Sequence, residues 1–213
     1  MSADKAGGRE KVLAQICQSL GRSGPAAEPI TPLPGPGPIP AFAGDVVERF
    51  VAKMREKAAT VEMLAALDEV GAVVARYIAA IPAPPQVRAS GALRTLAWPA
   101  GLQVQYGAAV REDLSSVTPC FAAVAESGGI VTLSGAETPS TLNFVPDNHI
   151  VVVHRHQVVA HFEDLWAKWR ATGQPLPRTV NIISGPSRTA DIEQTIQLGA
   201  HGPRRLHILL ISA

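Results

Sequence analysis

Residues 149–153 read His-Ile-Val-Val-Val, residues 180–183 read Val-Asn-Ile-Ile, and residues 206–211 read Leu-His-Ile-Leu-Leu-Ile. These short runs are continuous and rich in valine and isoleucine, which is typical of strands buried on both faces. Between them lie two stretches with helical spacing, residues 162–172 and 190–198. This order of strands and helices predicts an α/β fold, a mostly parallel sheet with helices on both faces and right-handed crossovers.

The chain ahead of these runs predicts further elements of the same kind. Residues 102–106 and 129–133 are shorter apolar runs that fit strands. Residues 45–65 carry apolar side chains at helical spacing, with Thr60 as the point where such a helix could break. Residues 70–81 predict a second helix, which must end before the prolines that follow.

The first forty residues differ in composition from the rest. Residues 9–20 carry Val12, Leu13, Ile16 and Leu20 at helical spacing, which predicts a helix. From Pro25 to Pro40 prolines recur every few residues, and proline both lacks an amide donor and disfavours a helical residue before it. We expect a helical N-terminal arm and linker over residues 1–40, and an α/β domain with a helical N-terminal part over residues 41–213. A docking peptide for a proline-reading domain is the alternative for the linker.

Composition narrows the class of protein. Of the 213 residues, 46% are hydrophobic and 17% charged, so the chain can bury a substantial core. The net charge of +1 gives no reason to expect nucleic acid or an anionic membrane as a partner. The start of the chain lacks a secretory pattern and the apolar runs are too short for a membrane span, which predicts a cytoplasmic protein. The two cysteines, Cys17 and Cys120, cannot hold a four-thiolate iron–sulfur cluster.

The most informative local motif is Ser-Gly-Pro-Ser-Arg-Thr-Ala-Asp-Ile-Glu at residues 184–193. It joins a predicted strand to a predicted helix, where free amides and the Arg188 guanidinium would bind an anion at the carboxyl edge of the sheet. The alternative is a capped helix in which Arg188 pairs with Asp191 or Glu193. The predicted ligand-binding residues are Ser184, Gly185, Ser187, Arg188, Thr189, Asp191 and His201.

The second half of the chain, from about residue 111 to residue 213, resembles the LUD-domain family. The segments that carry the resemblance are residues 126–133, 141–150, 162–166, 185–193 and 198–203, in the family's order. The resemblance implies a fold like that of sugar-phosphate isomerases and CoA-transferases. It also implies a non-redox accessory subunit that acts beside iron–sulfur proteins in the oxidation of L-lactate to pyruvate, with the clusters on those partners and no cofactor in this chain. A self-standing enzyme or binder for a phosphorylated or CoA-linked organic acid is the alternative.

Glu126 is the candidate catalytic residue. The sequence Glu126-Ser127-Gly128 is similar to the Glu-Asn-Gly motif by which class I CoA-transferases present a nucleophilic carboxylate, with serine in place of asparagine. The alternative is a carboxylate that binds backbone amides at the start of the following strand. The histidines at 154, 156 and 161 lack the spacing of a metal site, and we expect residues 154–156 to form a solvated turn.

Overall fold

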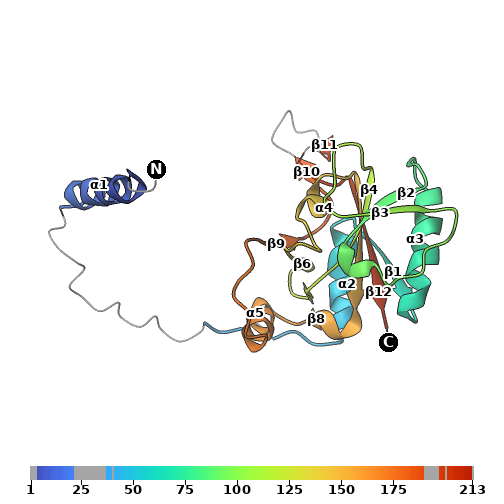
Figure 1. Ribbon diagram of the computed structural model, residues 1–213. Helices are drawn as coiled ribbons and strands as arrows, with labels where there is room; N and C mark the ends of the chain where they lie inside the picture. The colour runs from blue at the N-terminus through green and yellow to red at the C-terminus, as the bar shows by residue number, and fades with distance from the viewer. Residues whose placement is uncertain (1–3, 22–36, 40, 190–196, 200, 213) are drawn as a thin grey trace. The chain divides into compact units, whose positions relative to one another are not determined.

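The computed structural model describes residues 4–21, 37–39, 41–189, 197–199 and 201–212 (Figure 1). The chain divides into two compact units, Met1–Pro40 and Ala41–Ala213. In the first unit, helix α1 (Asp4–Ser19) confirms the helix predicted from apolar spacing. Its side chains Val12, Leu13 and Ile16 are exposed, and so is Leu20 directly after the helix. Most of the predicted linker lies outside the described residues.

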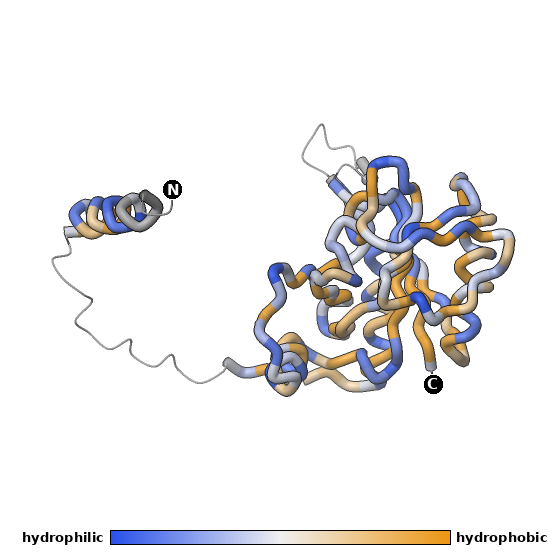
Figure 2. The backbone as a smooth tube through the Cα atoms, in the orientation of Figure 1, coloured by the Kyte–Doolittle hydropathy of each residue, from blue (hydrophilic) through white to orange (hydrophobic). Residues whose placement is uncertain are grey.

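A six-stranded sheet forms the centre of the second unit, and all its neighbouring strands run parallel. In spatial order the strands are β1 (Thr60–Leu64), β12 (Arg205–Ile211), β7 (Asn148–His154), β4 (Ser115–Pro119), β2 (Gln86–Ala89) and β3 (Gln103–Tyr106). The apolar residues of β7 and β12 are buried on both faces, as their continuous Val- and Ile-rich runs predicted. Figure 2 shows the backbone of the chain coloured by hydropathy. The predicted α/β fold with a mostly parallel sheet is confirmed.

Two helices cover opposite faces of this sheet. Helix α2 (Val46–Glu56) buries Phe50 and Met54 against Val151 and Ile208. Helix α3 (Val70–Ala79) packs its valines and Ile78 against the other face, which carries Ile150 and Leu209. Successive side chains along a strand point to opposite faces of the sheet. The strands β7 and β12 therefore contribute side chains to the apolar layers under both helices. Helices on both faces were predicted and are observed (Figure 1).

A second, smaller sheet packs against the buried face of α2 beside the large sheet. Its strand order is β8 (Val158–Val159), β5 (Ala122–Val124), β6 (Gly129–Leu133) and β9 (Val180–Ile183). Ala123 and Ile130 belong to the same buried cluster as Phe50, so the buried face of α2 joins the cores of the two sheets. Helix α5 (Phe162–Ala171) closes the other side of the small sheet with Leu165.

The remaining elements are short. They are the helix α4 (Thr141–Phe144), the single helical turns η1 (Leu67–Glu69), η2 (Gly91–Leu93) and η3 (Arg155–Gln157), and the strands β10 (Arg188–Thr189) and β11 (Gln197–Leu198). No helix in the described part of the chain is both long and apolar enough to cross a lipid bilayer.

The helix predicted over residues 45–65 is wrong beyond Glu56. The backbone turns at Ala58, which has a φ of 62°, and Thr60–Leu64 forms the edge strand β1. Val61 pairs with Ile208 in parallel register and packs beneath α2. Pairing with the buried strand β12 therefore decides the conformation of a segment whose local spacing also suited a helix.

The strand predicted at residues 180–183 is present but belongs to the other sheet. β9 pairs antiparallel with β6, so the expected crossover from β7 through β9 to β12 in one parallel sheet is wrong. The helix predicted over residues 190–198 is also wrong at its end, because Gln197 and Leu198 pair antiparallel with Thr189 and Arg188. Residues 190–196, which include Asp191, lie outside the described residues.

Candidate functional site

The predicted anion-binding loop lies at the amino edge of the six-stranded sheet. The Ser187 amide donates to the carbonyl of Pro203 (2.8 Å), two residues before β12 begins. The Ser187 hydroxyl accepts from the His201 amide (3.3 Å), so two of the predicted residues do meet. The expected position at the carboxyl edge is wrong because β9 runs in the small antiparallel sheet. Anion binding by Ser187, Arg188, Thr189 and His201 stays a prediction, and Asp191 lies outside the described residues.

Ser184 and Gly185 contact the C-terminal end of α2. The Lys57 ammonium donates to the Ser184 hydroxyl (2.7 Å) and to the Ser127 carbonyl (2.5 Å). Gly185 has a φ of +111°, and a Cβ there would lie 3.0 Å from the Lys57 carbonyl oxygen. The predicted residue Ser184 and the Glu126-Ser127-Gly128 turn therefore come together around Lys57, which local sequence patterns did not single out.

Both carboxylate oxygens of Glu126 are engaged by the start of helix α5. Its Oε2 lies 2.8 Å from His161 Nδ1, and its Oε1 accepts from the backbone amide of Phe162 (3.1 Å). Phe162 is the first residue of α5, so the carboxylate satisfies one of the amides that a helix leaves unpaired at its N-terminus. Glu126 therefore binds a backbone amide, as the alternative interpretation held, but that amide belongs to α5 and not to the following strand β6. The carboxylate acts as a clamp that joins the β5–β6 turn to α5.

We expect Glu126→Ala to lower the free energy of unfolding by about 1–3 kcal/mol, because it leaves the Phe162 amide and the His161 ring without their acceptor. Glu126→Gln should lower the free energy of unfolding by less, since its amide oxygen still accepts from Phe162 and its amide nitrogen can donate to His161. Chemical denaturation of the three proteins measures the difference. An alanine variant as stable as the wild type would contradict the clamp.

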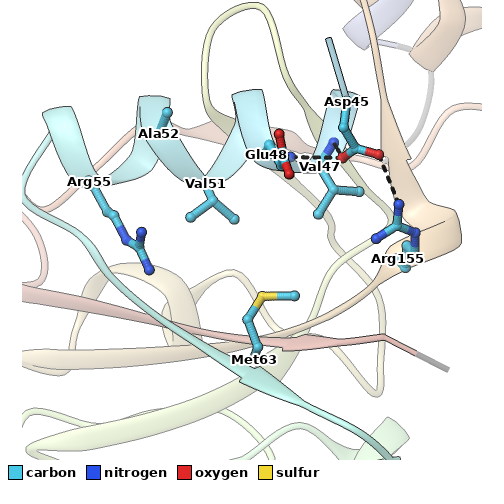
Figure 3. A pocket seen from close by; sticks show the side chains of 8 residues that line it. All are labelled: Asp45, Val47, Glu48, Val51, Ala52, Arg55, Met63 and Arg155. Atoms are coloured by element: carbon cyan, nitrogen blue, oxygen red, sulfur yellow. Dashed lines mark hydrogen bonds and ion pairs between the residues drawn. The ribbon is translucent and has the colours of Figure 1, made fainter.

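A groove opens at the carboxyl ends of β7 and β12, beside the N-terminus of α2. It consists of two cavities of about 420 and 480 Å³ that share Asp45, Val47 and Arg155. We call these two cavities together the carboxyl-edge groove. The first is also lined by Glu48, Val51, Ala52, Arg55 and Met63 (Figure 3), and the second by Val46, His156, Val158 and Ser212. Ligands of open parallel sheets bind at this edge, so the groove is the candidate functional site.

Asp45 organises the mouth of the groove. Its Oδ1 caps α2 by accepting from the amides of Val47 (2.8 Å) and Glu48 (2.9 Å), and its Oδ2 accepts from Arg155 Nη2 (2.9 Å). The hydrogen bond from the Glu48 amide is the main reason that the pKa of Asp45 is lowered, and Arg155 lowers it further. The carboxylate therefore stays ionised and holds Arg155 at the end of the sheet.

The floor of the groove is apolar. Met63 projects from the edge strand β1 and is 47% exposed, and Val47 and Val51 face it from α2 (Figure 3). Arg55 reaches into the same space from the opposite end of α2. Among the described residues, no carboxylate lies within ion-pairing distance of Arg55. An apolar floor with guanidinium groups at both ends suits a small organic anion.

Arg155 and His156 were expected to lie in a solvated turn. They do form the single helical turn η3, but Arg155 reaches a carboxylate 110 residues away in the sequence. A signal was available, because charged residues directly after a buried parallel strand stand at the carboxyl edge of the sheet. Their partner Asp45 could not be identified locally, since nothing in its sequence context points to the end of β7.

Comparisons with known proteins show what the second half of the chain is similar to. Residues 115–211 match the family model of the LUD domain. The crystal structure of a DUF162 family protein from Deinococcus radiodurans has the same fold. It has a TM-score of 0.60 and 21% sequence identity, over 78% of this chain and 96% of that one.

Among named proteins, the chain resembles lactate utilization protein C. It is 36% identical to that protein of Exiguobacterium over 107 residues, which are 48% of this chain and 46% of the relative. It is 32% identical to that of Bacillus subtilis over 92 residues, 42% of this chain and 38% of the relative. The alignments thus span less than half the length of these relatives. Arg155 and His156 lie inside the segment that matches the LUD-domain model, whereas Asp45, Arg55 and Met63 come from the segment ahead of it.

Proposed function

We propose that this protein is a non-redox accessory component of a bacterial system that oxidises L-lactate to pyruvate, and that it acts beside iron–sulfur proteins. The observation that carries the proposal is the LUD domain together with relatives named lactate utilization protein C. The electron carriers of the system then reside on the partner proteins, and this chain contributes an organic-acid site or a docking surface.

The two cysteines support a non-redox role. Cys120 is buried, and burial raises the pKa of its thiol to about 12, which does not suit thiol redox chemistry that proceeds through a thiolate. Cys17 is an exposed residue of α1. Two thiols cannot complete the four-thiolate set of a conventional cluster.

A deletion strain tests the proposal in the organism that encodes this chain. We expect the strain to lose growth on L-lactate as sole carbon source and to grow normally on pyruvate, because the missing step lies between the two compounds. Expression of the full chain from a plasmid should restore growth. Normal growth of the deletion strain on L-lactate contradicts the proposal, and so does an equal defect on pyruvate, which would place the protein after the oxidation step.

A further inference from the structure

We propose that the carboxyl-edge groove binds a singly charged 2-hydroxy carboxylate, with Arg155 as the anchor of the ligand carboxylate. This assignment rests on the proposed function for the choice of hydroxy acids among organic anions. The groove itself is an observation of the structure, as are its two guanidinium groups and its apolar floor.

Arg155 is free to take a second anion. Among the described residues, its guanidinium makes one hydrogen bond, from Nη2 to Asp45, and half of the side chain is exposed. The Asp45 carboxylate also accepts two amides at the start of α2, where the helix carries partial positive charge. Asp45 therefore neutralises Arg155 incompletely, and the remaining donors of the planar guanidinium can take a carboxylate.

The charges around the groove favour a ligand with one negative charge. Arg55 and Arg155 supply two positive charges, while Asp45 and Glu48 supply two negative ones. Asp45 is already occupied by Arg155 and the helix amides. Glu48 lines the same cavity, so it would repel a second carboxylate on the ligand.

The remaining lining residues match the other parts of such a molecule. Val47, Val51 and Met63 offer contacts to its carbon chain, and the space beside them accommodates a chain longer than that of lactate. His156 and Ser212 line the adjoining cavity together with Arg155, and they are the hydrogen-bonding groups placed to meet a hydroxyl next to the carboxylate. The two cavities meet at Arg155, where both polar groups of a 2-hydroxy acid would lie.

Isothermal titration calorimetry on the full-length chain tests the assignment with four probes: L-lactate, 2-hydroxyhexanoate, hexanoate and malate. We expect 2-hydroxyhexanoate to bind at least as tightly as L-lactate. Hexanoate lacks the hydroxyl and malate carries a second carboxylate, so both should bind more weakly. Arg155→Ala should lower the affinity for 2-hydroxyhexanoate roughly tenfold to a hundredfold, because the variant loses a charged hydrogen bond to the ligand carboxylate.

Two further variants make the test independent of folding. Arg170→Ala removes an exposed arginine from α5, outside the residues that line the groove, and should bind like the wild type. Met63→Trp fills the groove from an exposed position on β1 while both arginines stay in the sequence, and should abolish binding of 2-hydroxyhexanoate. Thermal melts of all variants establish that they are folded.

Absence of binding to the wild type overturns the assignment. Unchanged binding to either Arg155→Ala or Met63→Trp also overturns it, as does binding that is lost instead in Arg188→Ala at the amino edge. The deletion strain distinguishes failure of the groove assignment from failure of the proposed function. If Arg155→Ala restores growth on L-lactate as well as the wild type does, the accessory role stands and the groove assignment fails.

Discussion

Acidification from about pH 7 toward pH 4 is expected to lower the free energy of unfolding by several kcal/mol, because two histidines are buried in the neutral form. Burial lowers the pKa of His149 to about 3 and that of His207 to about 4. His149 is held by the Thr118 hydroxyl through Nε2 (2.8 Å), and its Nδ1 has no partner in the described part of the chain. A proton added to this ring would introduce a buried charge without a counter-ion.

His207 adds a second contribution in the same direction. Its ring stacks on Tyr77 with centroids 4.1 Å apart, and its Nδ1 lies 2.7 Å from the Thr60 hydroxyl. Burial is the main cause of its lowered pKa. Glu62 raises that pKa, whereas Arg76 lowers it. Glu62 therefore offsets only part of the cost of charging the ring.

The sign of the effect follows from which state binds the proton. Above about pH 6.5 both histidines are neutral in the folded and unfolded chain, so neither changes stability. Below that value the two histidines bind protons in the unfolded chain but stay neutral in the folded protein. Each histidine then lowers the free energy of unfolding by about 1.4 kcal/mol per pH unit until its own folded pKa is reached. The window closes near pH 3 for His149 and near pH 4 for His207.

Urea denaturation between about pH 7.5 and 4.5 measures how the free energy of unfolding depends on pH. The variant His149→Gln isolates the contribution of His149. Glutamine can still bond to the Thr118 hydroxyl but does not titrate, so the slope of the variant should be smaller by about 1.4 kcal/mol per pH unit. His156→Gln changes an exposed histidine and should keep the wild-type slope. Carboxylates that titrate in the same range cancel in the comparison. Equal slopes for His149→Gln and the wild type contradict the prediction.

Phe50→Ala is expected to lower the free energy of unfolding by about 3–5 kcal/mol. Phe50 is fully buried in α2, between the six-stranded sheet and the small sheet, and belongs to one cluster with residues of both. Truncation there leaves a cavity that neither sheet can fill without losing its own pairing. At about 2–4 °C per kcal/mol for a protein of this size, the melting temperature should fall by roughly 6–20 °C.

Differential scanning calorimetry measures this change, with Val110→Ala as the matched control. Val110 is an apolar residue of the same unit that is 49% exposed, so its truncation should change the melting temperature very little. A shift for Phe50→Ala no larger than that of the control would show that α2 is not a central element of the core.

Local patterns in the sequence determined the type of most elements. The continuous Val- and Ile-rich runs of β7 and β12 predicted buried parallel strands, and the apolar spacing of residues 70–81 predicted α3. The ordered segments of the second half also indicated the LUD domain, which the family model confirms. The type of an element depends on neighbouring residues, so it can be seen in a short window of sequence, whereas the resemblance rests on the order of several such segments.

Only the tertiary structure decided which segments meet. Val180–Ile183 has the composition of a buried parallel strand, but it pairs antiparallel with β6. The local spacing of Thr60–Leu64 suited a helix, but the segment forms a strand that pairs with β12. Asp45 and Arg155 meet across 110 residues, and Glu126 meets His161 across 35. Strand partners and ion pairs depend on long-range packing that periodicity does not encode, so the sequence alone determined the elements and the folded chain decided the site.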